Sequence, residues 1–297
     1  MYVGRFAPSP TGQLHFGSLI SAVASYCEAK VNQGQWLVRM EDLDKPREIQ
    51  GASDKILHQL EGFGFEWHGA VVYQSQRSKF YTEALNQLNT KQLIYPCTCT
   101  RKEISDVSTS LGIDGVIYPN ICLNYPIKPG AAIAYRIKIN RSDIYFNDAI
   151  QNGVHQKIDE DVGDFIIKRA DGFFAYQLAV VVDDALQGVT HIVRGADLLD
   201  STPRQIYLQQ QLKFATLQYA HVPIATNNQN EKLSKQTLAK PIEINMASQL
   251  IYDALCFLGQ QPPPALKNAF LSEVWQWTLQ HWDILAVPKT RQIRINS

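Results

Sequence analysis

Apolar positions in the first ninety residues follow two different spacings. Short continuous apolar runs predict buried strands, and apolar residues three or four positions apart predict amphipathic helices. The predicted strands cover residues 2–6 and 36–40, and the predicted helices begin at Gly17 and cover 53–63 and 78–88. Strands that alternate with helices are typical of a parallel sheet covered by helices, so this region predicts one half of an α/β domain.

After residue 90 the apolar pattern becomes irregular and later returns to strand-like runs. Residues 91–160 carry three cysteines and scattered turn residues, with one extended stretch over 132–139. We interpret this segment as an insertion between the two halves of the sheet. The later predicted elements are strands over 165–168, 174–182 and 191–194 and a helix over 202–212. Asp183 and Asp184 follow one of these strands and are assigned to its turn, without a chemical role.

The end of the chain predicts two amphipathic helices, over residues 247–258 and 264–281, separated by consecutive prolines. The patterns together predict three parts. They are an α/β core in two halves, 1–90 and 161–240, an inserted α+β subdomain over 91–160, and a short helical C-terminal region over 241–297.

Composition narrows the class of protein. Of the 297 residues, 45% are hydrophobic and 19% are charged, which is typical of a globular protein. No run of about 18 apolar residues predicts a membrane span, and no basic segment followed by an apolar run predicts a signal peptide, so we expect a cytoplasmic protein. The 28 basic residues balance the 28 acidic ones, so a contact with nucleic acid would depend on a local patch.

The turn after the first predicted strand has the composition of a nucleotide site. Residues 5–18 read RFAPSPTGQLHFGS, in which two prolines and Gly12 force a turn before a helix. Unpaired N–H groups and the positive end of the helix dipole favour a phosphate there. His15 and Ser18 add two side-chain donors. Taken alone, the segment could equally be an ordinary strand–turn–helix connection.

A second segment, residues 232–236, reads KLSKQ and completes a pair. The two segments together resemble the paired signatures of class I aminoacyl-tRNA synthetases, and the RFAPSPTG form resembles their glutamyl branch. The resemblance implies a Rossmann-like catalytic core that binds Mg-ATP and activates an amino acid. The residues that it assigns to ATP are His15, Gly17, Ser18, Lys232, Ser234 and Lys235, with His15 and Lys235 as catalytic residues. The chain departs from the usual pattern at Ser18, where many members have His, and at Gln236, where Ser is usual.

Five further residues have the chemistry that a free glutamate requires. Arg5 and Arg194 can each present a planar guanidinium to a carboxylate, and Glu41 can accept the ammonium group. Tyr176 and Ser9 can donate hydroxyl groups. The glutamyl branch binds its amino acid with residues at the matching positions, although the sequence leaves open which arginine takes which carboxylate. Tyr176 could instead be a core aromatic residue, and Glu41 could belong to a solvated acidic turn or bind Mg²⁺ with its acidic neighbours.

Three cysteines, Cys97, Cys99 and Cys122, lie close together in the sequence of the predicted insertion. Clustered thiols in a cytosolic chain favour zinc over a disulfide framework, and zinc takes about four ligands. Zinc-binding glutamyl enzymes often show C-x-C followed by C-x-H, but Asn124 stands in the last position here. The resemblance to shorter synthetase paralogues implies Tyr118 as the fourth ligand. Three buried free cysteines are the alternative.

The resemblance to glutamyl-tRNA synthetases covers roughly residues 1–240 and stops where their anticodon-binding domain begins. This pattern resembles a family of truncated paralogues, the glutamyl-queuosine tRNA(Asp) synthetases. That family forms glutamyl-adenylate from L-glutamate and ATP and transfers glutamate to the cyclopentene-diol of queuosine in the anticodon loop of tRNA(Asp). We expect the same activity here, in a monomer. The alternatives are a minimal glutamyl-tRNA synthetase that charges the tRNA 3′ end and a non-catalytic paralogue that binds glutamate or ATP.

Overall fold

The computed structural model describes residues 1–113, 115–140, 142–229, 231–233 and 240–295. Its first sheet is parallel, with the strand order β1-β2-β3. The strands are β1 (Val3–Phe6), β2 (Gln35–Met40) and β3 (Val72–Tyr73), and the helices beside them are α1 (Phe16–Val31), α2 (Ala52–Gly62) and α3 (Ser78–Thr90). These bounds confirm the strand and helix predictions for this half.

The sheet of the second half has the strand order β11-β12-β8-β9 and takes β8 and β9 from the segment that the sequence analysis interprets as an insertion. Its strands are β8 (Asp143–Asp148), β9 (Asn152–Lys157), β11 (His191–Gly195) and β12 (Gln218–Val222), and its helices are α7 (Tyr176–Leu186) and α8 (Thr202–Leu212). The two halves meet at β1 and β11, where the Thr190 amide donates to the Val3 carbonyl at 2.9 Å. The carboxyl ends of β1, β2, β11 and β12 therefore converge. In open α/β sheets, ligands bind at such an edge.

The prediction of a strand over 174–182 is wrong, because most of this segment belongs to helix α7. Its apolar run from Leu178 to Val182 is buried throughout, so no polar face marks the helical period. A short, fully buried apolar run has the same pattern in a helix and in a strand. The consequence for Asp183 and Asp184 is direct: they lie within a buried helix rather than in a turn.

The inserted segment contributes an antiparallel sheet with the order β10-β7-β4. Its strands are β4 (Ile94–Cys97), β7 (Ala134–Ile137) and β10 (Ile166–Lys168), with short strands β5 (Leu111–Gly112) and β6 (Gly115–Val116). Its helices are α4 (Arg101–Val107), α5 (Ile121–Asn124) and α6 (Ile158–Asp161). The extended stretch predicted over 132–139 is confirmed as β7.

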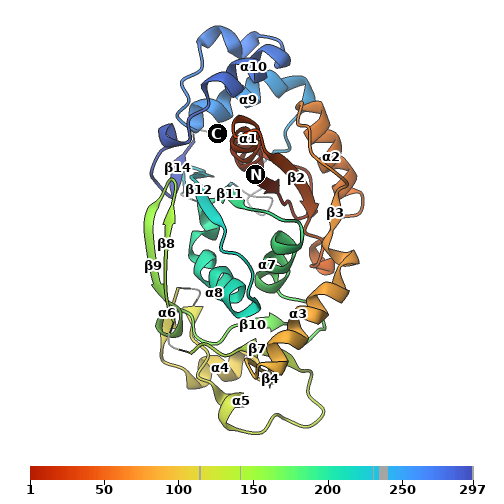
Figure 1. Ribbon diagram of the computed structural model, residues 1–297, viewed down its shortest axis with the longest axis vertical. Helices are drawn as coiled ribbons and strands as arrows, with labels where there is room; N and C mark the ends of the chain where they lie inside the picture. The colour runs from red at the N-terminus through yellow and green to blue at the C-terminus, as the bar shows by residue number, and fades with distance from the viewer. Residues whose placement is uncertain (114, 141, 230, 234–239, 296–297) are drawn as a thin grey trace.

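The C-terminal segment packs against α1 through helices α9 (Ala247–Phe257) and α10 (Leu271–His281). The prediction of one helix over 264–281 is wrong in part. Its first residues form a 3₁₀ turn, and the extended residues Ala269 and Phe270 separate this turn from α10. Strand β14 (Gln292–Arg294) pairs in parallel with β13 (Ile224–Thr226). Helices α9 and α10 lie at one end of the long axis of the molecule, and α4 and α5 lie at the other (Figure 1). None of the described helices is long and apolar enough to cross a membrane.

Candidate active site

The turn between β1 and α1 ends in a tight helix cap. The Ser18 hydroxyl donates to the His15 carbonyl and accepts from the His15 amide, both at 2.8 Å. In return the Ser18 amide donates to Nδ1 of His15 at 3.4 Å. These reciprocal bonds fix the start of α1 and the direction of its first free N–H groups. In this structure Ser18 therefore caps the helix, and its contact with a phosphate stays a prediction.

The start of α1 approaches Leu233 of the second signature segment and bonds to residues that follow this segment, more than 200 positions away in the sequence. The Ile242 amide donates to the Leu14 carbonyl at 3.0 Å, and His15 bridges to Pro241. A Cβ atom on Gly17 would lie 3.2 Å from the Leu233 carbonyl oxygen, so a glycine permits this close approach. Lys232 forms an ion pair of 2.5 Å with Asp197. The predicted ATP residues Ser234 and Lys235 lie outside the described residues.

A cavity of about 150 Å³ opens between this turn and the end of β2. Ser9 lines one side, and Glu41, Asp42 and Asp44 line the other. The Glu41 amide donates to the Pro8 carbonyl at 3.0 Å, which fixes the two walls relative to each other. A larger cavity of about 250 Å³ lies at the opposite edge of the sheet, near Tyr2 and the start of β11, away from the signature segments.

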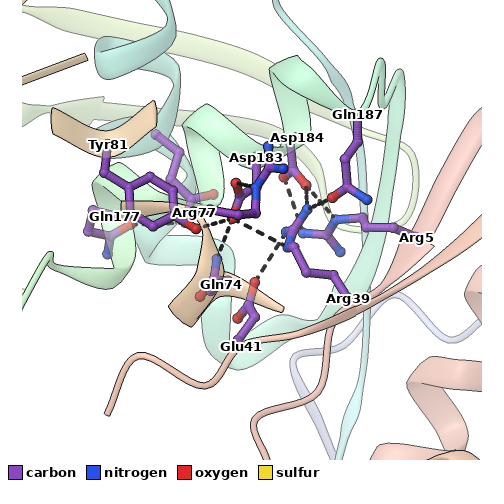
Figure 2. A network of polar contacts seen from close by, with 11 residues as sticks. Arg5, Arg39, Glu41, Gln74, Arg77, Tyr81, Gln177, Asp183, Asp184 and Gln187 are labelled. Carbon is purple, nitrogen blue, oxygen red and sulfur yellow. Dashed lines mark hydrogen bonds and ion pairs between the residues drawn. The ribbon is translucent and has the colours of Figure 1, made fainter. Parts of the chain in front are cut away.

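Helix α7 carries a buried ionic network that the sequence analysis did not identify (Figure 2). Asp184 lies between Arg5 on β1, at 3.2 Å, and Arg39 on β2, at 2.8 Å. Arg39 in turn contacts Glu41 at 3.2 Å. One carboxylate thus orients two arginines from neighbouring strands and, through Arg39, the acidic residue at the cavity. A signal was present in the sequence, because two acids inside an apolar run require buried cationic partners.

The neighbouring Asp183 is engaged on the other side of α7. It accepts from Arg77 at 2.5 Å, from the Tyr81 hydroxyl at 2.7 Å and from the Gln74 amide at 2.8 Å (Figure 2). These partners lie on or beside α3, so Asp183 joins that helix to α7. Asp183 therefore binds mainly the surrounding scaffold, with a longer contact of 3.9 Å to Arg39 on β2, and Asp184 binds the strands at the site.

Burial and charge act in opposite directions on the acids of this network. Burial alone would raise the pKa of Asp184, but Arg5 and Arg39 hold that pKa below its usual value. Burial raises the pKa of Glu41, and the positive charges of Arg39 and Arg5 oppose that shift. The two arginines therefore favour the anionic form of Asp184, whereas burial opposes the anionic form of Glu41. A ligand with a positive charge beside Glu41 would favour its anionic form.

Arg194 occupies the end of β11, on the other side of the site. Its Nε–H donates to Nε2 of His221 at 3.0 Å, and its Nη2 donates to the Thr202 hydroxyl at 2.8 Å. Sequence reasoning missed both partners, because they lie on β12 and at the start of α8. Nothing near Arg194 in the sequence marked them.

Tyr176, the first residue of α7, lies in the electrostatic field of both arginines. Burial raises the pKa of its phenol, Glu41 raises it further, and Arg194 and Arg5 lower it. The structure thus gathers Arg5, Glu41, Tyr176 and Arg194 around one region, with Ser9 on the adjoining cavity. Their contact with glutamate is not tested by this arrangement and stays a prediction.

The three cysteines of the insertion converge as the sequence predicts. Their sulfur atoms lie within 4.8 Å of one another, and the Tyr118 hydroxyl lies 3.4 Å from Sγ of both Cys97 and Cys99. The Cys122 amide donates to the same hydroxyl at 2.8 Å. The Arg136 guanidinium stacks 3.7 Å from the centre of the Tyr118 ring. Three thiols and one phenol oxygen around one point fit the donor number of a tetrahedral zinc site.

Comparison with known proteins agrees with this architecture. Residues 2–259 match the family described as class I tRNA synthetases (E and Q), catalytic domain. The glutamate-tRNA synthetase of Elizabethkingia anophelis superposes with a TM-score of 0.79 at 21% identity, over 99% of this chain and 68% of that one. A glutamate tRNA ligase from Elizabethkingia meningosepticum, solved with its amino acid, gives 0.78 over 99% of this chain and 66% of that one. The fold is therefore that of a class I synthetase catalytic domain.

Closer relatives narrow this class. Glutamyl-Q tRNA(Asp) synthetase of Dechloromonas aromatica is 52% identical over 97% of this chain and 96% of its own length. The protein of the same name from Neisseria meningitidis serogroup C / serotype 2a is 53% identical over 97% of this chain and 98% of its own length. The chain belongs to the glutamyl-Q tRNA(Asp) synthetase family.

Proposed function

We propose that this chain activates L-glutamate with ATP and transfers the glutamyl group to the cyclopentene-diol of queuosine in the anticodon loop of tRNA(Asp). The observation that carries this proposal is the match to relatives named glutamyl-Q tRNA(Asp) synthetase, at about half identity and over nearly the whole chain. The approach of Leu233, in the second signature segment, to Gly17 at the start of α1 supports the activation step.

The reaction has two balanced steps. An oxygen of the glutamate α-carboxylate attacks the α-phosphorus of ATP, and pyrophosphate leaves with the electron pair of the broken P–O bond. A hydroxyl oxygen of the queuosine diol then attacks the carbonyl carbon of the adenylate, AMP leaves, and the hydroxyl proton passes to solvent or to a base. Preorganised donors aimed at the developing charge accelerate steps of this type.

The residues present suit these two ligands. We assign ATP to His15, Gly17, Ser18, Lys232, Ser234 and Lys235, where the N-terminus of α1 adds free N–H groups. We assign glutamate to Arg5, Ser9, Glu41, Tyr176 and Arg194. In this assignment Glu41 accepts the ammonium group, and the guanidinium groups face the carboxylates.

The proposed organisation keeps the core in two halves, residues 1–90 and 161–240, around the insertion 91–160, with 241–297 as the C-terminal region. Zinc bound by Cys97, Cys99, Tyr118 and Cys122 would hold the insertion together. Its role would be structural, because all four protein donors would close the coordination shell.

Mapping the position of radiolabelled glutamate on tRNA tests the proposed function. After reaction with total tRNA, we expect the label in an anticodon-loop fragment and no label on tRNA from cells that lack queuosine. Label at the 3′ end would support the minimal glutamyl-tRNA synthetase instead. Absence of glutamate-dependent ATP–pyrophosphate exchange, with and without tRNA, would support the non-catalytic alternative.

Metal analysis tests the zinc site separately. We expect one zinc ion per chain in the wild type and loss of that ion in C122S, because a serine hydroxyl is a poor zinc ligand. The matched control is C256S, which removes an exposed thiol outside the cluster and should leave the zinc content unchanged. Equal zinc content in wild type and C122S would contradict the assignment.

A further inference from the structure

The polar cluster around Arg194 is assembled from four separate elements. Arg194 is the last residue but one of β11, His221 lies on β12, Asp148 ends β8 and Thr202 begins α8. Nδ1 of His221 lies 2.6 Å from Oδ2 of Asp148, and its Nε2 lies 3.0 Å from Nε of Arg194. At most 5% of any of these residues is exposed, so solvent does not replace a missing bond.

The contacts of Asp148 determine where the protons lie. Its Oδ1 accepts from the backbone amides of Ile150, Gln151 and His221, at 2.9 to 3.1 Å. Burial would raise the pKa of Asp148, but the hydrogen bonds from His221 and from these amides hold that pKa below its usual value. An ionised Asp148 accepts a proton-bearing Nδ1–H, which leaves the lone pair of His221 on Nε2. Nε2 is then the acceptor that the Arg194 Nε–H requires.

His221 is therefore a neutral support for a buried cation. Burial lowers the pKa of His221 to about 4, and the charge of Arg194 acts in the same direction. Thr202 is neutral as well, and its hydroxyl donates to the Leu198 carbonyl at 3.1 Å while it accepts from Arg194. Neither partner compensates the charge of the guanidinium.

Arg194 consequently retains both a charge and a donor for another group. Within the part of the chain that the structure describes, no carboxylate forms a direct ion pair with Arg194, because Asp148 reaches it only through His221, and the buried Nη1 of Arg194 has no hydrogen-bond partner. A buried cation without a direct anionic partner and a buried donor without an acceptor both cost free energy. A carboxylate that reaches Nη1 would remove both costs. An amide oxygen would satisfy the donor but leave the charge.

We propose that Asp148, His221 and Thr202 are positioning residues that hold Arg194 as the charged partner of the side-chain carboxylate of glutamate, the group that glutamine lacks, and so favour glutamate over glutamine. The inference rests on the proposed function, because it takes glutamate as the ligand of this site. None of the three residues touches the substrate in this arrangement. They act through Arg194, by fixing two of its nitrogens and leaving the third available.

The D148N variant tests the proton arrangement with almost no change of shape. An asparagine at this position places an NH₂ group where Oδ2 accepted the Nδ1 proton. His221 then takes the other tautomer, and its Nε2–H faces the Arg194 Nε–H, donor against donor. The Thr202 hydroxyl, 3.2 Å from Nε2, becomes the acceptor for that proton and competes with Nη2 of Arg194. We expect the Kd of L-glutamate, measured by calorimetry, and its KM in ATP–pyrophosphate exchange to rise at least about tenfold, while the KM of ATP changes by less than about twofold. We expect the preference for glutamate over glutamine to fall at the same time, because glutamate binding is weakened.

Thr202 supplies a matched pair of variants. T202V removes the hydroxyl that accepts from Nη2 while keeping the shape of the side chain, and T202S retains that hydroxyl. We expect T202V to raise the Kd of L-glutamate about five- to tenfold and T202S to keep this Kd within about twofold of the wild-type value. If both variants bind glutamate equally, the hydroxyl does not position Arg194.

A double-variant cycle distinguishes positioning from simple structural support. In an H221Q background the Asp148 carboxylate no longer sets a histidine tautomer, so adding D148N should change the KM of glutamate by less than about twofold. A lower melting temperature in D148N with an unchanged KM of glutamate, or equal rises in both KM values, would overturn the proposal. Absence of glutamate binding by the wild-type chain would overturn the proposed function together with this inference. Wild-type binding that persists in D148N would overturn the inference alone.

Discussion

The two arginines of the site are both buried, but the protein supports them in opposite ways. Arg5 shares the carboxylate of Asp184 with Arg39, so its charge is compensated before any ligand arrives. Arg194 is held by a neutral histidine and a hydroxyl group, and its Nη1 has no partner among the described residues. A paired arginine mainly stabilises the fold, whereas an arginine that keeps its charge is prepared for an anionic ligand. From this comparison we predict that Arg194 contributes more than Arg5 to recognition of the negative charge of glutamate.

The D184N variant should show the largest effect, on the Arg5 side. It leaves two buried guanidinium groups without their shared anion, and we expect the free energy of unfolding in urea to fall by about 3–5 kcal/mol. The control is D171N, which alters an exposed ion pair with Arg169 and should change stability by less than about 1 kcal/mol. Equal losses in the two variants would show that Asp184 is not the anion that stabilises Arg5 and Arg39.

The pH dependence of stability tests the neutral histidine on the Arg194 side. An unfolded histidine titrates near pH 6.5, whereas burial lowers the pKa of folded His221 to about 4. Between these values the unfolded chain binds more protons at this residue, so the free energy of unfolding falls as the pH is lowered through this window. The contribution is about 3 kcal/mol between pH 6.5 and 4, and the H221Q variant should lack it. A wild-type slope in H221Q would mean that the site does not hold a neutral histidine.

Lysine substitutions should show that Arg194 mainly affects glutamate affinity and that Arg5 mainly affects stability. R194K loses the donors to His221 and Thr202, and we expect it to weaken glutamate about 10- to 100-fold. R5K should lower stability more than R194K does, because it breaks a buried contact with Asp184. Calorimetric titration with L-glutamate and urea unfolding give both quantities for each variant. A larger loss of glutamate affinity in R5K than in R194K would reverse the comparison.

The Y176F variant should have the smallest effect, because it removes a neutral hydroxyl group and leaves the charges of both arginines in place. Removing its hydroxyl should weaken glutamate about two- to tenfold, the usual range for one neutral hydrogen bond. Its melting temperature should stay close to that of the wild type. If glutamate binds Y176F as tightly as wild type, the hydroxyl does not contact the amino acid and the residue is a core aromatic.

Local pattern was sufficient for much of the core. The strands β1, β2 and β11 and the helices α1, α2 and α8 follow from apolar spacing and from turn residues such as Gly12 and the proline after Thr202. The signature residues, the cysteine cluster and the two arginines were also visible, because each is a short motif or an unusual residue at the end of an apolar run. The resemblance to the glutamyl branch came from the same residues.

The supports of the site were not visible in the same way. Helix α7 is buried along its apolar run, so its period could not be distinguished from that of a strand, and its two acids were assigned to a turn. Arg5 and Asp184 are 179 positions apart, and Asp148 and His221 are 73 apart. No local pattern records such pairs, because the first forms only when helix α7 packs on the sheet and the second only when β8 and β12 lie side by side. By itself the sequence determined which elements form and which residues have the chemistry for glutamate and ATP. The tertiary structure alone decided which arginine is already paired with an anion and which one has no direct anionic partner among the described residues.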